Sequence, residues 1–86
     1  MPVLSNFYGI VIRIFFTRSF VAHFHAIYRD YELVVGIEDI AVIQGEAPPR
    51  VHEMVLEWAS AHQRELQEAW RRCEHAIPPR PIQPLE

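Results

Sequence analysis

Residues 8–16 are rich in β-branched and aromatic side chains, and alternate positions form one apolar face, made of the isoleucines at positions 10, 12 and 14 with Tyr8 and Phe16. Side chains two residues apart point to the same side of a strand, and β-branched and aromatic residues favour strands. The alternation therefore predicts a first β-strand over residues 8–16. A connection over residues 17–22 follows, and its length is ordinary for a loop.

Residues 23–29 and 32–38 alternate in the same way and predict a β-hairpin that turns at positions 30 and 31. If Arg29 pairs with Glu32, these opposite charges stabilise the pairing of the two strands. The apolar side chains of both strands then form one surface toward the core. That surface is made of Phe24, Ala26, Tyr28, Leu33, Val35 and Ile37.

The other face of this hairpin is more polar and carries both histidines, His23 and His25. The same register places His23 opposite Glu38. Arg13 of the first strand belongs to this face, which we expect to be free of helices. Residues 41–44 predict a short edge strand that ends at Gly45.

Apolar residues follow a period of 3.6 residues after Val51, at positions 51, 55, 58, 59, 62, 66, 69, 70 and 73. Pro49 suits the first turn of a helix, because the backbone N–H that proline lacks would make no hydrogen bond within the helix there. The pattern predicts one long helix that runs to about Glu74. Four of the seven prolines follow Ile77 and predict an extended tail, either a docking strand for a partner or a lid held by Ile82 and Leu85.

The expected fold is therefore α+β, a small antiparallel sheet of three to four strands with one long C-terminal helix packed across one face. We expect one domain over residues 1–76 and a Pro-rich tail over residues 77–86. Half of the 86 residues are hydrophobic and 22% are charged, a balance typical of folded globular proteins.

The composition also narrows the classes of partner. The formal net charge of −3 gives no general attraction to nucleic acid, although a local basic patch could supply one. Cys73 is the single cysteine, which rules out an internal disulfide and favours a reducing cytoplasm. The apolar N-terminal stretch is broken by Arg13, is too short to span a bilayer and has no basic leader, so we expect neither secretion nor membrane insertion.

Two histidines on one strand face are candidates for acid–base chemistry. One could take a proton from the 2′-hydroxyl of RNA while the other protonates the leaving oxygen, and Arg13 could stabilise the charged phosphate. His23, His25 and Arg13 are thus the candidate catalytic residues. The neighbouring binding residues on the same face are Arg29, Glu32 and Glu38.

Two other interpretations of this face remain open. His23 and His25 could bind one metal ion with Glu38 as a third ligand, but no fourth ligand stands out, and we expect no metal or other cofactor to be needed. The group could also consist of ordinary solvated residues on an open sheet face.

Several chemically distinctive side chains lie on the apolar stripe of the predicted helix. We interpret His62 as a core histidine bound to backbone or to a carboxylate, and Trp58 and Trp70 as core residues. Cys73, on the same stripe, is expected to act as a small buried hydrophobe.

A His-x-His strand is combined in this chain with a helix that carries Glu-Trp and then His. Together with these motifs, a set of stretches covers nearly the whole chain: residues 5–13, 23–26, 55–59, 62, 65–66 and 82–85. In these stretches the chain resembles a family of short bacterial proteins catalogued as domain of unknown function 4160.

The resemblance implies no settled activity. Genes of the family often lie beside those of domain of unknown function 2442, and the pair looks like a toxin–antitoxin module. We therefore expect a protein-binding component whose partner is encoded by a neighbouring gene, and the acidic pI of 5.9 favours this function. The alternative is a metal-independent ribonuclease that uses the two histidines.

Overall fold

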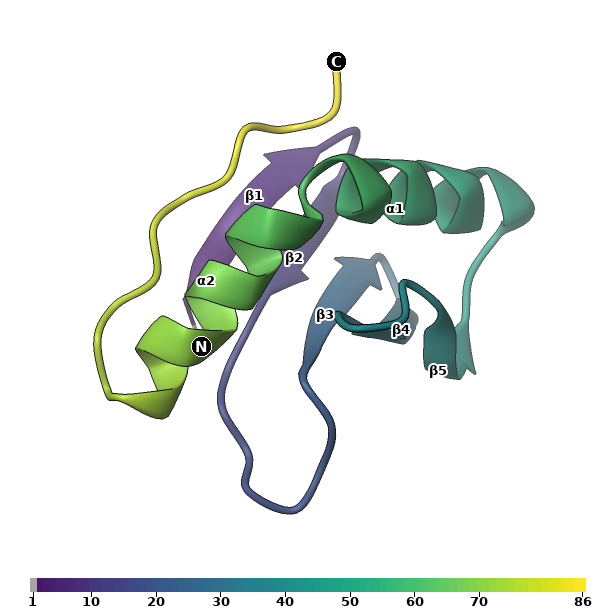
Figure 1. Cartoon of the computed structure of the whole chain (residues 1–86). Helices are drawn as coiled ribbons and strands as arrows, with labels where there is room; N and C mark the ends of the chain where they lie inside the picture. Colours follow the sequence, from purple (N-terminus) through teal and green to yellow (C-terminus); the bar gives the residue numbers. More distant parts are fainter. Residues whose placement is uncertain (1) are drawn as a thin grey trace.

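The computed structural model describes residues 2–86 and contains one five-stranded antiparallel sheet followed by two helices (Figure 1). The strands pair in chain order, each with the next. The elements are β1 (Val3–Phe7), β2 (Ile10–Arg13), β3 (His23–Tyr28), β4 (Tyr31–Gly36), β5 (Val42–Glu46), α1 (Pro49–Ala61) and α2 (Gln63–Glu74). The predicted α+β class is confirmed, while the predicted number of strands and the single helix are wrong.

The strand predicted over residues 8–16 is shorter in the structure, where β2 covers Ile10–Arg13. It forms a hairpin with β1, a strand that was not predicted. Tyr8 and Gly9 both have positive φ, 51° and 80°, and they connect Phe7 to its register partner Ile10. A two-residue turn with two positive φ values suits the right-handed twist of a hairpin. Tyr8 is consequently exposed at the turn and does not face the core. The isoleucines at 10, 12 and 14 are fully buried, as predicted.

The hairpin of β3 and β4 turns one residue earlier than predicted. Arg29 takes a positive φ of 53°, which allows a two-residue turn that pairs Tyr28 with Tyr31 and Ile27 with Glu32. The predicted pairing of Arg29 with Glu32 is therefore wrong. The true register differs from the predicted one by two residues along β4, and a shift of two leaves every side chain on its predicted face.

The predicted single helix is broken at His62, whose φ of −120° and ψ of 24° lie outside the helical range. The side-chain amide of Gln63 donates hydrogen bonds to the backbone carbonyls of Ile37 and Glu38, at 2.8 and 3.0 Å. These bonds tie the break to the chain segment that follows β4. No helix among residues 2–86 is long and apolar enough to cross a membrane.

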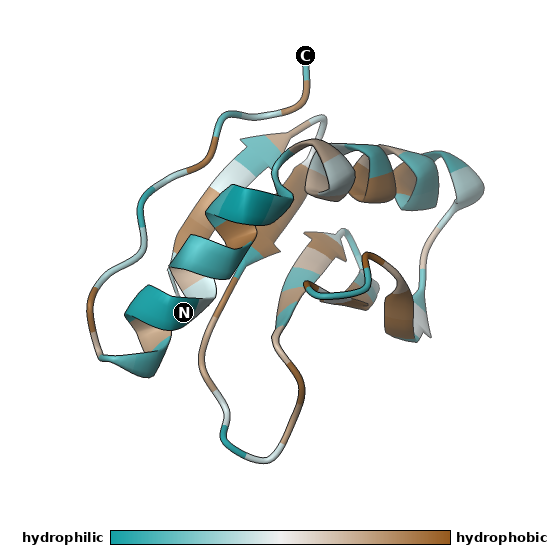
Figure 2. Ribbon diagram, in the orientation of Figure 1, coloured by the Kyte–Doolittle hydropathy of each residue, from teal (hydrophilic) through white to brown (hydrophobic). Residues whose placement is uncertain are grey.

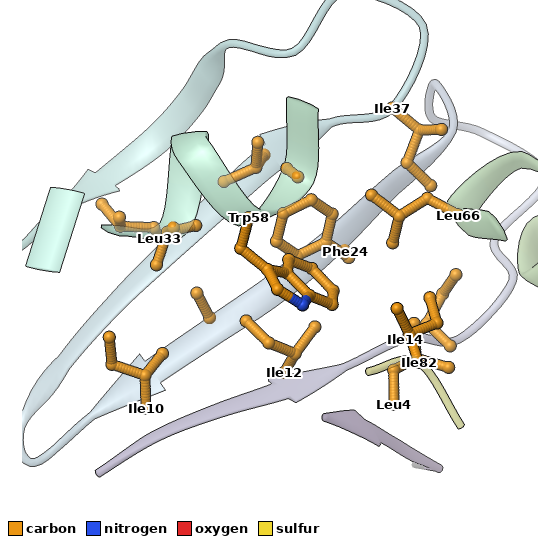
Figure 3. Close-up of a cluster of buried hydrophobic side chains, with 14 of the residues drawn as sticks. Leu4, Ile10, Ile12, Ile14, Phe24, Leu33, Ile37, Trp58, Leu66 and Ile82 are labelled. Atoms are coloured by element: carbon orange, nitrogen blue, oxygen red, sulfur yellow. The ribbon is translucent and has the colours of Figure 1, made fainter. Parts of the chain in front are cut away.

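Both helices pack on the same face of the sheet, and their apolar sides face the strands (Figures 1 and 2). Trp58 lies at the centre of this core, fully buried next to Phe24 and Ile12 (Figure 3). The core includes Leu4, Ile10, Leu33, Val35, Val51, Val55, Leu66 and Ala69.

The C-terminal tail packs beside β1 (Figure 1). The Ile82 amide donates a hydrogen bond to the Leu4 carbonyl at 2.7 Å, and the Ile82 side chain is buried. Leu85 packs against the same core. These contacts are those expected of a lid, and they protect the free backbone edge of β1.

Candidate functional site: the open face of the sheet

The candidate site is the face of the sheet opposite the helices, and the strand register shows which side chains share this face. We call it the open face. One row across it joins Val11, Ile27, Glu32 and Glu46, and the next joins Arg13, His25, Val34 and Gln44. Val11, Ile27 and Val34 are half-buried and form an apolar stripe on strands β2 to β4.

Two carboxylates border this stripe. Glu32 and Glu46 are direct register partners on β4 and β5, and both are exposed. Like charges directly opposite each other destabilise a strand pair. Glu32 accepts a hydrogen bond from Nδ1 of His25 at 2.7 Å, whereas no ion pair to Glu46 occurs among residues 2–86. This end of the open face therefore attracts cations.

Glu46 was missed from the sequence because the edge strand was expected to end at Gly45. Gly45 has a φ of 92°, and a Cβ atom at this position would lie 2.1 Å from the backbone oxygen of Glu32. Only glycine allows β5 to continue past this close approach and to bring Glu46 beside Glu32. The glycine was interpreted as the end of the strand, although it lies within it.

His25 is held in one orientation by two neighbours. Its ring stacks on Phe15, with ring centres 4.8 Å apart and an interplanar angle of 13°. A carboxylate can only accept, so Nδ1 of His25 is the donor in its bond to Glu32. Nε2 is buried and has no hydrogen-bond partner among residues 2–86.

His23 lies at the start of β3 and is 3% exposed, so the interpretation of both histidines as ordinary solvated residues is wrong for His23. Its Nδ1 donates to the Val21 carbonyl at 2.7 Å. Ring contacts connect His23 to His25, at 5.1 Å, and to Trp70 from α2, at 5.4 Å. We call this group the aromatic cluster: Phe15, Phe16, Phe20, His23, His25 and Trp70.

Of the remaining predicted site residues, Arg13 lies beside the histidines, whereas Arg29 and Glu38 lie outside the strands. Arg13 is the register partner of His25 and joins the histidines on the open face. Arg29 lies in the turn with its guanidinium 5.2 Å from the ring centre of Tyr28. Glu38 follows the end of β4, and its carboxylate accepts a weak hydrogen bond from Gln67 at 3.4 Å.

The ligand set predicted for a metal ion is therefore not assembled. His23 pairs with Gly36 and not with Glu38, so Glu38 cannot be the third ligand that the predicted register suggested. Within residues 2–86, no group of three or more His, Cys, Asp or Glu side chains is arranged to hold an ion.

Four helix residues were interpreted as structural, and all four lie in or next to the core: Trp58, His62, Trp70 and Cys73. Trp58 is fully buried, and His62 donates from Nδ1 to the Glu65 carboxylate at 2.6 Å. Trp70 and Cys73 are only partly buried. Desolvation by burial raises the pKa of the Cys73 thiol above its ordinary value, which disfavours a reactive thiolate.

Comparison with known proteins finds a family match over most of the chain. Residues 9–71 match the family model described as Domain of unknown function (DUF4160). The chain belongs to this family. The matched range contains β2 to β5, which carry the apolar stripe and both carboxylates, while β1 and the C-terminal tail lie outside it. No curated protein and no solved structure matches the chain.

Proposed function

We propose that this DUF4160 protein is the protein-binding component of a toxin–antitoxin-like module. Its partner is a small protein encoded by a neighbouring gene, and it docks on the open face. One observation carries the proposal: the sheet has a helix-free face with an apolar stripe, Val11, Ile27 and Val34, next to two opposed carboxylates. An apolar centre with a polar rim is the usual composition of a protein interface.

The carboxylates specify the chemistry of the partner. Glu32 and Glu46 face each other, and the whole chain has a net charge of −3. A lysine or arginine of the partner, placed between the two carboxylates, would relieve their repulsion. The partner is therefore expected to present apolar side chains to the stripe and a basic side chain to Glu46.

Co-expression with the products of the adjacent genes tests the proposal. We expect one of them to co-purify with the wild-type chain in a defined ratio. Ile27→Arg places a charge in the middle of the apolar stripe and should abolish co-purification. Ile77→Arg makes the same change on the exposed tail, 46% exposed, and should leave the complex intact. Failure of every neighbouring product to bind, or equal binding by the two variants, would contradict the proposal.

The second candidate function is metal-independent RNA cleavage by His23 and His25. The hydrogen bond from Nδ1 of His25 to Glu32 favours it, because this bond fixes the ring and leaves Nε2 as the nitrogen that could exchange a proton with a substrate. We rank it second because Nε2 of His25 is buried, and a phosphodiester must reach it. Cleavage of labelled RNA by the wild type and its loss in His25→Ala would support this function, and equal activity of the two proteins would exclude it.

A further inference from the structure

A pocket of about 320 Å³ lies at one end of strands β4 and β5. Its lining is mostly apolar and consists of Val21 and Ala22, which precede β3, together with Gly36, Ala41 and Ile43. Pockets that bind drug-sized ligands measure about 300–1,000 Å³. This pocket is at the lower limit of that range, so it suits a single apolar side chain of a partner.

Gly36 places the pocket on the open face. It is the register partner of His23 and lies two residues beyond Val34 of the apolar stripe, and residues two apart on a strand share a face. A Cβ atom at this position would lie 3.3 Å from Cδ1 of Ile43 and 3.0 Å from the backbone oxygen of Asp39. The glycine therefore keeps this space free of a side chain, and the pocket continues the apolar stripe.

The rim of the pocket is acidic. Glu38 and Asp39 line it, both residues are exposed, and no basic residue within residues 2–86 lines it. The Glu38 carboxylate accepts only the weak hydrogen bond from Gln67, at 3.4 Å. Opposite charges across an interface select the partner and fix its register. A segment that fills the pocket is therefore expected to carry a basic side chain next to the apolar one.

The strand β5 offers a free backbone edge beside this pocket. It is the last strand in the sheet order and pairs with β4, whereas at the opposite edge the Ile82 amide binds the Leu4 carbonyl (Figure 1). An edge strand presents unpaired N–H and C=O groups to which an extended peptide can add as a further strand. Ile43 lies on β5, is 42% exposed and lines the pocket. A segment paired with β5 would therefore bring its side chains to the pocket.

We propose that an extended segment of the partner protein pairs with the free edge of β5, places one apolar side chain in this pocket and sets a neighbouring lysine or arginine against Glu38 and Asp39. This inference rests on the proposed function, in which the chain binds a protein, and it defines the segment that is bound. A second copy of the chain is the poorer occupant. Each copy has a net charge of −3 and would bring its own exposed Glu46 to the shared edge, and like charges at an interface oppose binding.

Panning a displayed library of random seven-residue peptides against the purified full chain tests the site without any neighbouring gene product. We expect the enriched sequences to share an apolar residue next to a lysine or arginine. No enrichment, or enrichment of acidic sequences, would overturn the proposal. Because the peptides do not come from a neighbouring gene, failure of this experiment is distinct from failure of the co-expression experiment.

Two matched pairs of variants locate the selected peptide, with its Kd measured by fluorescence polarisation. Ile43→Ser removes an apolar side chain from the pocket and should raise the Kd at least about tenfold. Val3→Ser, at a position of β1 that is 46% exposed, should leave the Kd unchanged. Asp39→Asn should raise the Kd about threefold, while Asp30→Asn, in the turn between β3 and β4, should not. All four positions are exposed, so we expect every variant to fold.

Hydrogen exchange tests the strand pairing itself. Binding of the selected peptide should slow the exchange of backbone amides in β5, because amides at the free edge gain a hydrogen-bond partner. Equal Kd values for Ile43→Ser and Val3→Ser would overturn the pocket, and unchanged exchange in β5 would overturn the pairing. A dimer of the chain alone that Ile43→Ser dissociates, seen by size-exclusion chromatography, would overturn the choice of occupant.

Discussion

Nε1 of Trp58 donates a hydrogen bond to the backbone carbonyl of Gln83, 2.8 Å away and 25 residues further along the chain. The bond joins the centre of the core to the C-terminal tail, next to the buried side chain of Ile82. The tail is therefore part of the folded structure, although it contains no regular secondary structure.

The tail should contribute measurably to stability. Ile82→Ala removes a side chain that is 4% exposed, and we expect it to lower the free energy of unfolding by about 2–5 kcal/mol. Ile77→Ala, at an exposed tail position, should change it by no more than about 0.5 kcal/mol. Urea denaturation measures both values. Similar small losses in the two variants would show that the tail does not pack on the core.

Gly45 should not tolerate a side chain. A strained backbone angle alone costs about 1–3 kcal/mol. At Gly45 the positive φ is combined with the 2.1 Å approach of a Cβ atom to the Glu32 oxygen, so Gly45→Ala should lower the free energy of unfolding by more than this amount. Gly9→Ala is the comparison, since Gly9 also has a positive φ but its nearest side-chain neighbour would be 3.4 Å from the new Cβ. Thermal melting should rank Gly45→Ala as the more destabilised protein, and the reverse order would contradict the described path of β5.

His23 should behave as a core residue. His23→Ala removes ring contacts with Phe20 and Trp70, and we expect a loss of about 2–3 kcal/mol in the free energy of unfolding. His75→Ala, at an exposed position, is expected to stay within about 0.5 kcal/mol of the wild type. If chemical denaturation finds the two variants equally stable, the aromatic cluster is not packed as described.

Cys73 should react slowly with thiol reagents near neutral pH. Burial raises its pKa, so a smaller fraction is thiolate in the folded protein than in the unfolded chain. The stability linked to this shift is present below the ordinary thiol pKa and is lost as the pH rises through the raised one. Labelling rates in buffer and in urea measure the effect, and equal rates would show that the thiol is not desolvated.

Local periodicity was enough to predict much of the core, although it missed Leu4 and Phe7 of β1. The alternation of Ile10, Ile12 and Ile14 and the helical spacing of Trp58 and Leu66 identified residues that are all fully buried. Such patterns depend only on the geometry of a strand or a helix, so they can be read from neighbouring residues.

Features that depend on distant contacts were not predictable in this way. The break at His62 is stabilised by hydrogen bonds from the Gln63 side chain to the backbone carbonyls of Ile37 and Glu38, which lie 26 and 25 residues earlier in the chain. The burial of His23 depends on Trp70, which comes from another element. Of the candidate site, the pattern correctly placed Arg13 and both histidines on one face. It missed Glu46, because the chain passes Gly45 in a conformation specific to glycine.

The open face as a protein-binding surface is the central claim, and a charge reversal at its rim tests it most directly. The measurement is the Kd of the purified chain for the product of a neighbouring gene, by isothermal titration calorimetry, for the wild type, Glu46→Arg and the control Glu53→Arg. Glu53 is an exposed carboxylate of α1 on the helical side of the molecule. We predict that Glu46→Arg raises the Kd at least tenfold, about 1.4 kcal/mol, and that Glu53→Arg leaves it unchanged. Equal Kd values for the two variants, or no binding by the wild type, would contradict the claim.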